Sequence, residues 1–204
     1  MKVTGLEPIK KTKWKVYIDE QFAFVLYKGE IVRYEIQKDR KISEETVDRI
    51  KTEVLTKRAK RRALYLLSRM ERTREQLRRR LEQDFYPEDV AESAIRYVES
   101  FGYIGDADYA RRYISSRQST KSAWEMKMAL LQKGIAKEEV ERALKECAPE
   151  QKESDTIRRI LEKKRFFAET ASDAEKKKMQ DYLLRKGFHY EEIRQVIQVP
   201  FWNT

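Results

Sequence analysis

The side chains best suited to chemistry are basic ones that recur along one short segment. Residues 57–80 have the sequence KRAKRRALYLLSRMERTREQLRRR. An α-helix turns 100° per residue, so one side of a helix here would carry Arg58, Arg61, Tyr65, Arg69 and Arg72. Guanidinium groups bind phosphates, and an aromatic ring between them can stack on an exposed base. The pattern predicts a surface that contacts nucleic acid or an anionic protein.

The opposite side of the same helix is apolar, which gives the helix a face to bury. It carries Ala59, Ala63, Leu66, Leu67 and Met70. Further arginines extend the basic surface onto the next helix. The full candidate set for binding is Arg58, Arg61, Arg62, Tyr65, Arg69, Arg72, Arg74, Arg78 and Arg79. The alternative interpretation is the solvated face of a charged helix with no binding role.

The distribution of charge favours the binding interpretation. The chain has 204 residues and a formal net charge of +10. Residues 49–80 contain 13 Lys and Arg against 3 Asp and Glu, so this segment alone accounts for the excess. A concentrated positive field attracts polyanions such as nucleic acid or a nucleoprotein assembly. Hydrophobic residues make up 40% of the chain, with only 6 Gly and 4 Pro, so we expect a folded, mostly helical protein.

The sequence contains no arrangement of residues that is typical of catalysis. It has no Ser/His/Asp set, no Cys/His pair, no Gly-rich phosphate loop and no carboxylate cluster with a nearby base. His189 and Cys147 are the only residues of their types, too few for a usual zinc site or for a disulfide. Asp106 and Asp108 fit the start of a helix better than a metal pair. We expect a protein that is not an enzyme and that holds no cofactor and no metal.

The expected location follows from what the sequence lacks. No stretch of about 18 apolar residues could cross a membrane. The N-terminal sequence MKVTGLEPIKKTK has no apolar core of a secretory signal. We therefore expect a cytoplasmic protein without a membrane partner, and a monomer.

A small β-structure is predicted before the helices begin. The stretches KWKVYID, FAFVLY and IVRYEI lie within residues 13–36, and Lys28-Gly29 is a turn signal between the last two. We predict an antiparallel hairpin or three-stranded meander that packs on helices. From about Glu44 to Met70 the apolar period becomes 3.6, and Ser43 is a suitable N-cap. One long helix is predicted there.

The rest of the chain repeats itself. The phrases RLEQDFYPEDV, LLQKGIAKEEV and LLRKGFHYEEI occupy residues 80–90, 130–140 and 183–193, and their apolar positions coincide without gaps. Each copy follows a capping-box pattern, which begins at Thr73, Ser122 and Ser172. Gly134 and Gly187 end the helices of the second and third copies, and Asp84 occupies that position in the first. The spacing predicts three tandem units of three helices each.

The predicted fold is mainly α, with three tandem three-helix repeats that form an elongated curved array. Residues 1–42 form the β extension, 43–100 the basic first repeat, 101–149 the second, and 150–204 the third with the C-terminal tail. The tail VPFWNT, with Phe201 and Trp202, is expected to fold back on the third repeat.

Three stretches, ALYLLSRMERTREQLRRRL, FGYIGDADYA and LLQKGIAKEEVERAL, resemble the RecX family of regulators of the RecA recombinase. The likeness extends from about residue 44 to residue 198, and the N-terminal strands resemble a β-extension of some members. The departures from the family pattern are Thr73 where Ser is frequent, Asp84 where Gly is usual, and Gly105 where Asn is common. None of these substitutions is expected to change the fold.

The resemblance implies a partner and a role in homologous recombination, DNA repair and the SOS response. Members of the family bind the RecA–DNA filament and suppress its ATPase and strand-exchange activities, and some bind DNA directly. We therefore expect a non-enzymatic modulator, and specifically an inhibitor, that binds a RecA-type recombinase filament through the basic surface. Binding to single- or double-stranded DNA would be weaker and non-specific. The alternative is a general DNA-binding protein with no recombinase partner.

Overall fold

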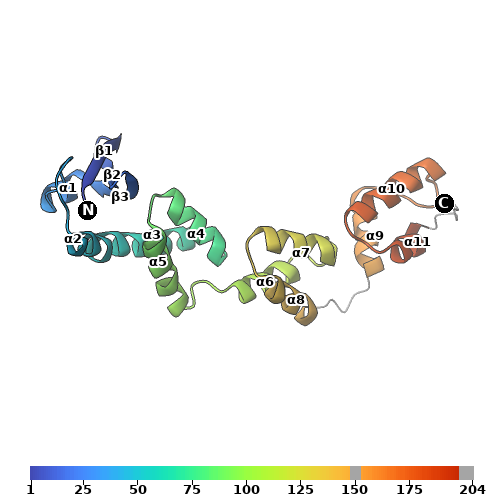
Figure 1. Cartoon of the computed structure of the whole chain (residues 1–204). Coiled ribbons are helices and arrows are strands. Elements are labelled where there is room, and N and C mark those ends of the chain that lie inside the picture. Colours follow the sequence, from blue (N-terminus) through green and yellow to red (C-terminus); the bar gives the residue numbers. More distant parts are fainter. Residues whose placement is uncertain (148–152, 198–204) are drawn as a thin grey trace. The chain divides into compact units, whose positions relative to one another are not determined.

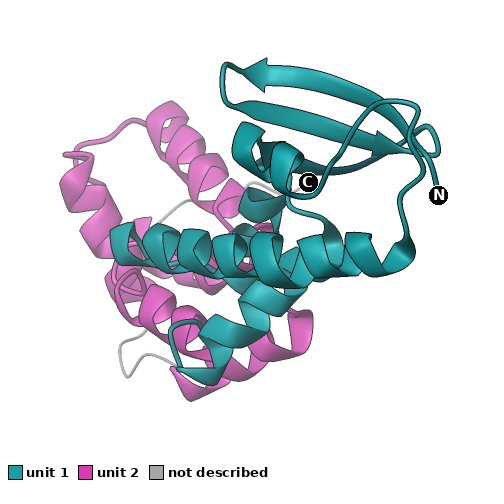
Figure 2. Cartoon of the chain, turned by 90° about the vertical axis from the view of Figure 1, so that its left-hand side faces the viewer, with its two compact units in different colours: residues 1–105 teal, residues 106–204 magenta. Residues whose placement is uncertain are grey.

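The structure is a computed structural model that describes residues 1–147 and 153–197 (Figure 1). The chain forms two compact units, Met1–Gly105 and Asp106–Thr204 (Figure 2). Three three-helix repeats and a small antiparallel sheet confirm the predicted mainly α fold. The elongated curved arrangement and the segment limits at residues 42, 100 and 149 stay predictions. The expected packing of Phe201 and Trp202 lies outside the described residues.

The sheet is a three-stranded antiparallel meander in the order β1-β2-β3. Its strands are β1 (Val3–Lys10), β2 (Lys13–Ile18) and β3 (Gln21–Tyr27). Strand β1 was not predicted, because its Gly5 and Pro8 are unusual inside strands. Pro8 is tolerated because β1 lies at the edge of the sheet, where one side of the strand has no neighbouring strand to bond.

The strand predicted within residues 31–36 is wrong, because the chain turns into a short helix there. Helix α1 spans Lys28–Arg33. The Glu30 carboxylate accepts a hydrogen bond from the Tyr27 backbone N–H at 2.7 Å and also pairs with Arg58. These contacts close the first turn of the helix and outweigh the strand preference of the β-branched Ile31 and Val32.

The long helix predicted from Glu44 is present, with one irregularity. It consists of α2 (Glu44–Arg49), a π-helical segment η1 (Ile50–Thr56) and α3 (Lys57–Arg69). The Ser43 side chain accepts a hydrogen bond from the Thr46 N–H at 3.1 Å, as expected of an N-cap. Within unit 1 the sheet lies along one side of this helix (Figure 2).

The first repeat packs the sheet and three helices around one core. Helices α4 (Arg74–Gln83) and α5 (Glu88–Ser100) follow α3. The core joins strand residues to residues of every helix of the repeat, and it includes Val16, Phe24, Leu26, Leu55, Ala59, Ala63, Leu77, Leu81 and Ile95. The sheet therefore packs on helices, as predicted, and is fixed relative to α3 and α4.

Unit 2 contains the second and third repeats, each with its own apolar cluster. The second comprises α6 (Asp106–Ser115), α7 (Ala123–Gln132) and α8 (Lys137–Glu146), and the third α9 (Glu153–Lys163), α10 (Asp173–Arg185) and α11 (Tyr190–Ile197). The repeats touch where α10 ends. The Ser122 hydroxyl donates to the Lys186 carbonyl, and Lys186 Nζ lies 2.5 Å from a Glu125 carboxylate oxygen.

The helix boundaries agree with the predicted signals, except at the end of α4. All three capping boxes form, and Gly134 and Gly187 have positive φ. In the first repeat, however, Phe85 and not Asp84 adopts the left-handed conformation, with φ of 68°. Asp84 keeps φ of −82°, and its carboxylate accepts a hydrogen bond from Arg62 Nε at 2.7 Å. Helix α4 thus ends one aligned position later than α7 and α10 do.

Candidate nucleic-acid interface

Helix α3 has a buried face and an exposed face. Ala59, Ala63 and Leu66 are buried and Leu67 is partly buried, as predicted. The prediction is wrong for Met70, which is 57% exposed, because the chain leaves the helix there in an extended conformation. On the other side, Arg61 and Arg69 are exposed, and the Tyr65 ring between them is 50% exposed. The Arg69 guanidinium carbon lies 5.4 Å from the centroid of the Tyr65 ring. These three residues form an exposed row, called the α3 row below, in which cations alternate with an aromatic ring.

Two neighbouring arginines of α3 are partly buried and paired within unit 1 instead. Arg58 pairs with Glu30, donates to the Val25 carbonyl at 3.2 Å, and lies 4.5 Å over the Tyr27 ring. Arg62 pairs with Asp84 at 2.7 Å. Both side chains are largely covered, so their charges are already matched within the protein. Arg58 therefore holds α3 to the sheet and to α1, and Arg62 holds α3 to the end of α4. Neither guanidinium group is available to an external anion without the loss of these contacts.

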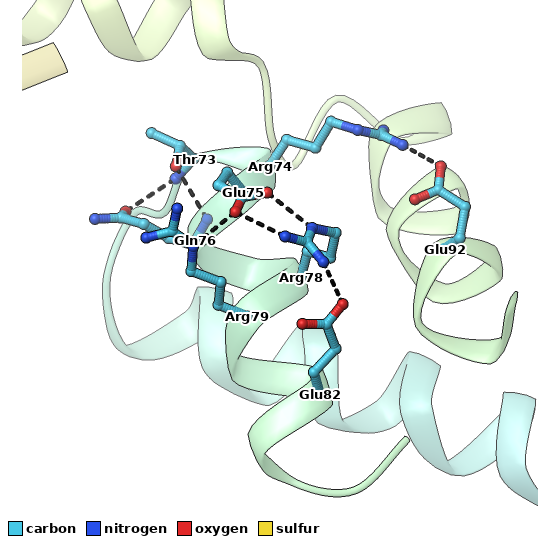
Figure 3. A network of polar contacts seen from close by, with 8 residues as sticks. All are labelled: Thr73, Arg74, Glu75, Gln76, Arg78, Arg79, Glu82 and Glu92. Carbon is cyan, nitrogen blue, oxygen red and sulfur yellow. Dashed lines mark hydrogen bonds and ion pairs between the residues drawn. The ribbon is translucent and has the colours of Figure 1, made fainter. Parts of the chain in front are cut away.

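The arginines of α4 form an ion-pair network (Figure 3). Arg78 binds Glu75 at 2.8 Å and also pairs with Glu82, and Arg79 binds Glu75 at 2.6 Å. Hydrogen bonds from Arg78, followed by those from Arg79, hold the pKa of the Glu75 carboxyl at about 2. The Glu75 carboxyl is therefore ionised at neutral pH, and a phosphate would have to compete with carboxylates to bind these guanidinium groups.

Arg74 is held in a similar way at the start of α4. It pairs with Glu92 and Glu99 on α5, and these carboxylates raise the pKa of its guanidinium, mainly through the hydrogen bond to Glu99. Arg72 lies just before α4, and its Nε is buried without a hydrogen-bond partner. The structure therefore brings the nine candidates into one unit but does not give them equivalent surroundings.

Partners from outside the basic segment neutralise most of its charge. The pairing carboxylates that lie beyond residues 49–80 in sequence include Glu30, Glu82, Asp84, Asp89, Glu92 and Glu99. Within residues 1–147 and 153–197, the cations of the segment that pair with no carboxylate are Lys57, Lys60, Arg61, Arg69 and Arg72. The free positive charge is thus concentrated on α3 and the residues that follow it.

A groove beside α3 adds basic residues that the sequence analysis did not select. Its volume is about 560 Å³, and its walls come from the sheet, from α3 and from the loop after α4. Lys10 and Lys13 line it at the β1–β2 turn, together with Tyr27, Arg61 and Phe85. The two lysines could have been found only if β1 had been predicted, because its pairing with β2 brings them together.

Neither a metal-ligand cluster nor a membrane-spanning helix is found in the described part of the chain. No group of three or more His, Cys, Asp or Glu residues in it is arranged to hold a metal ion. None of its helices combines the length and apolar character needed to cross a bilayer. Cys147, at the end of α8, is a half-buried thiol without a disulfide partner.

Comparison with known proteins identifies the repeats. Sequence models for the first, second and third three-helix domains of RecX match residues 59–97, 106–144 and 151–197, respectively. Together they cover more than half of the chain, and each falls within one of the predicted repeats.

Whole-chain relatives and solved structures agree. The chain is 29% identical over 191 residues to the regulatory protein RecX of Caldanaerobacter subterraneus subsp. tengcongensis, an alignment that covers 93% of this chain and 94% of the relative. It is 29% identical over 202 residues to that of Clostridium perfringens strain 13, which covers 97% and 95%.

A crystal structure of regulatory protein RecX shares the fold, with a TM-score of 0.61 at 22% identity over 97% of this chain and 98% of that one. The crystal structure of RecX from Lactobacillus salivarius gives a TM-score of 0.58 at 25% identity, over 71% and 95%. With three family domains matched in order, the chain belongs to the RecX family.

Proposed function

We propose that this protein is a regulator of a RecA-type recombinase that binds the recombinase–DNA filament and lowers its activity. The observation that carries the proposal is the α3 row, where Arg61, Tyr65 and Arg69 are exposed and the two arginines have no carboxylate partner among the described residues. The choice of a recombinase as partner rests on what the resemblance to the RecX family implies, and the relatives are named regulatory protein RecX. The protein acts in the cytoplasm as a monomer and without chemistry of its own.

Inhibition requires more than attachment to the filament. A ligand shifts an equilibrium between two states only by the difference in its affinity for them. The sheet, α3, α4 and α5 share one core in unit 1, so the α3 row is presented on a rigid support. A rigid row of cations can bind the phosphates or acidic groups of one filament geometry better than those of another. We propose that it binds the less active geometry more tightly.

The experiment is a titration into a DNA-stimulated RecA ATPase assay. The expected result is loss of ATPase activity at amounts of protein far below those that cover the DNA, because each molecule acts on assembled recombinase. If activity falls only when the DNA is saturated, the protein competes for DNA, and the alternative of a general DNA-binding protein holds instead.

The residues are tested by charge reversal on the α3 row. The double variant Arg61→Glu/Arg69→Glu should lose inhibition. The control Lys38→Glu/Lys41→Glu changes the net charge by the same amount at exposed positions outside α3 and should keep inhibition. Arg58 is unsuitable for this test, because its reversal would set a carboxylate against Glu30 and disturb the fold. Unchanged inhibition by the α3 double variant would show that the row is not the contact surface.

A further inference from the structure

The groove between the sheet and α3 combines uncompensated cations with aromatic rings. Lys10 and Lys13 face each other across the β1–β2 pair, and Arg61 approaches from α3. Within the described ranges 1–147 and 153–197, none of these three cations is paired with a carboxylate. The carboxylate that lines the groove, Asp84, is already bound to Arg62 at 2.7 Å. The groove is therefore a positive concavity.

Aromatic rings stand between these cations. Tyr27 is 36% exposed and Phe85 39% exposed, and both line the groove. Lys13 Nζ lies 5.3 Å from the centroid of the Tyr27 ring, and Lys15 Nζ lies 5.3 Å from that of Phe85. Phe85 has a left-handed backbone conformation, with φ of 68°. The ring packs edge to face against Phe22, with centroids 6.2 Å apart, and still exposes part of its surface in the groove.

The phenol of Tyr86 adds a neutral donor to the same wall. Burial is the largest cause that raises the pKa of Tyr86, to about 12. The hydroxyl group therefore stays protonated at neutral pH and brings no negative charge into the groove. With Asp84 bound to Arg62, nothing in the described lining opposes the approach of an anion.

We propose that this groove binds a short stretch of single-stranded nucleic acid. Lys10, Lys13 and Arg61 hold its phosphates, and the exposed rings of Tyr27 and Phe85 contact its bases. Single strands bind where a positive groove follows the backbone and aromatic side chains meet the bases. An acidic peptide would satisfy the cations but present no flat rings, and a duplex keeps its bases stacked inside. The sheet thereby gains a role, which goes beyond the proposed regulation of a recombinase.

The test uses the full-length protein, a fluorescently labelled oligothymidylate and no recombinase, so its result does not depend on the proposed regulatory activity. The double variant Lys10→Gln/Lys13→Gln removes two groove cations that lie outside the α3 row. Each single-strand phosphate contact contributes about 0.7 to the log–log salt slope. The variant should lower that slope by about 1.4 and weaken binding about 20-fold at 0.1 M salt. The matched control Lys38→Gln/Lys41→Gln should change affinity less than about twofold, because exposed charges outside the groove act only through the screened overall field.

A second variant separates base contact from phosphate contact. Phe85→Leu keeps an apolar side chain but removes the ring, and should weaken oligothymidylate binding about tenfold, since one stacked base is lost. Binding of inorganic polyphosphate, which has no bases, should remain unchanged in this variant. Thermal unfolding of each variant, followed by circular dichroism, checks that the fold is retained.

Two results would overturn the proposal. The first is oligothymidylate binding by folded Lys10→Gln/Lys13→Gln that matches the control variant. The second is competition by polyglutamate as strong as that by unlabelled oligothymidylate, which would identify the groove as a site for acidic protein segments.

Discussion

Gly187 lies directly against Trp124: a Cβ atom placed on Gly187 would lie 2.6 Å from the Cβ and 2.8 Å from the Cγ of the tryptophan. Gly187 ends α10 with φ of +79°, and Trp124 belongs to the first turn of α7. The glycine therefore serves two purposes. It ends a helix, and it allows the third repeat to approach the second within unit 2.

Replacement of Gly187 should cost more than replacement of a glycine that only ends a helix. Gly187→Ala adds about 1–3 kcal/mol of overpacking to about 1–2 kcal/mol of left-handed strain. Gly102 is the matched control, because it has φ of +69° but nothing within 4 Å of its would-be Cβ. Gly102→Ala should cost only the strain. Guanidinium unfolding of both variants measures the difference, and equal losses would mean that the contact with Trp124 relaxes freely.

Arg61 and Arg62 are adjacent in sequence but should behave differently on mutation. Arg62→Ala removes the partner of Asp84 in a partly covered pair and should lower the free energy of unfolding by about 1–2 kcal/mol. Arg61→Ala should leave stability within about 0.5 kcal/mol yet weaken single-strand binding about fivefold. Denaturation and anisotropy titrations on the two proteins test this. The reverse pattern, with Arg61 as the stabilising residue, would contradict the assignment of charges on α3.

Two of the capping residues, Ser122 and Ser172, should differ in their contribution to stability because of what else they contact. Ser172→Ala removes an exposed cap and should cost about 0.5–1 kcal/mol. Ser122→Ala should cost at least about 1 kcal/mol more, because the Ser122 hydroxyl also donates to the Lys186 carbonyl, which would be left without that donor. Ser172→Thr keeps the capping oxygen and serves as the control. A smaller loss for Ser122 than for Ser172 would show that the bond between the repeats contributes nothing.

His189 should make the third repeat slightly more stable at mildly acidic pH. Its ring nitrogen lies 2.6 Å from a Glu153 carboxylate oxygen, and this hydrogen bond, with the attraction of that charge, raises the pKa of the imidazole above 6.5. Because the pKa of His189 is higher in the folded state than in the unfolded state, the stabilisation is complete at pH values below the unfolded-state pKa. It is lost as the pH rises through the folded-state pKa. The side chain is 83% exposed, so solvent screening limits the gain to less than about 1 kcal/mol.

The measurement is the difference in melting temperature between the wild type and His189→Gln at pH 5.5 and pH 8.5. The wild type should exceed His189→Gln in melting temperature by more at pH 5.5 than at pH 8.5, since His189 is the only histidine of the chain. In a Glu153→Gln background, His189→Gln should no longer change the melting temperature in a pH-dependent way. A difference that grows with pH would contradict the predicted sign.

The repeats could be predicted from the sequence because their signals are local. Capping boxes at Thr73, Ser122 and Ser172 involve residues three positions apart, and the αL glycines act through their own backbone. The errors arose where a distant residue decides the local structure. The helix at Lys28–Arg33 forms around Glu30, whose carboxylate binds Arg58 far along the chain. Asp84 is likewise held by Arg62, which moves the left-handed residue to Phe85.

The candidate surface was predictable as a set but not in its division of roles. Helical periodicity placed Arg61, Tyr65 and Arg69 on one side of α3, and the structure exposes them. Periodicity could not show that Arg74 meets carboxylates, since Glu92 and Glu99 come from another helix. The partners of Arg78, Glu75 and Glu82, lie three and four positions away on α4 and could have been found from helical spacing. Charge counted along a sequence overestimates the free charge of a surface when the compensating groups arrive through tertiary packing. Lys10 and Lys13 were not predicted as binding residues, because the edge strand β1 that places them beside α3 was not predicted.

The π-helical segment Ile50–Thr56 absorbs one surplus residue in an otherwise regular helix. Buried positions along it step by five from Ile50 to Leu55, and by four from Leu55 to Ala59 and on to Ala63. Deletion of the exposed Thr52 would turn the step of five into an ordinary step of four, and the arginines downstream would keep their direction. The same deletion inside α3 would rotate everything beyond it by about 100°. Length variation among homologues can thus be accommodated at this one place without redirecting the basic side chains.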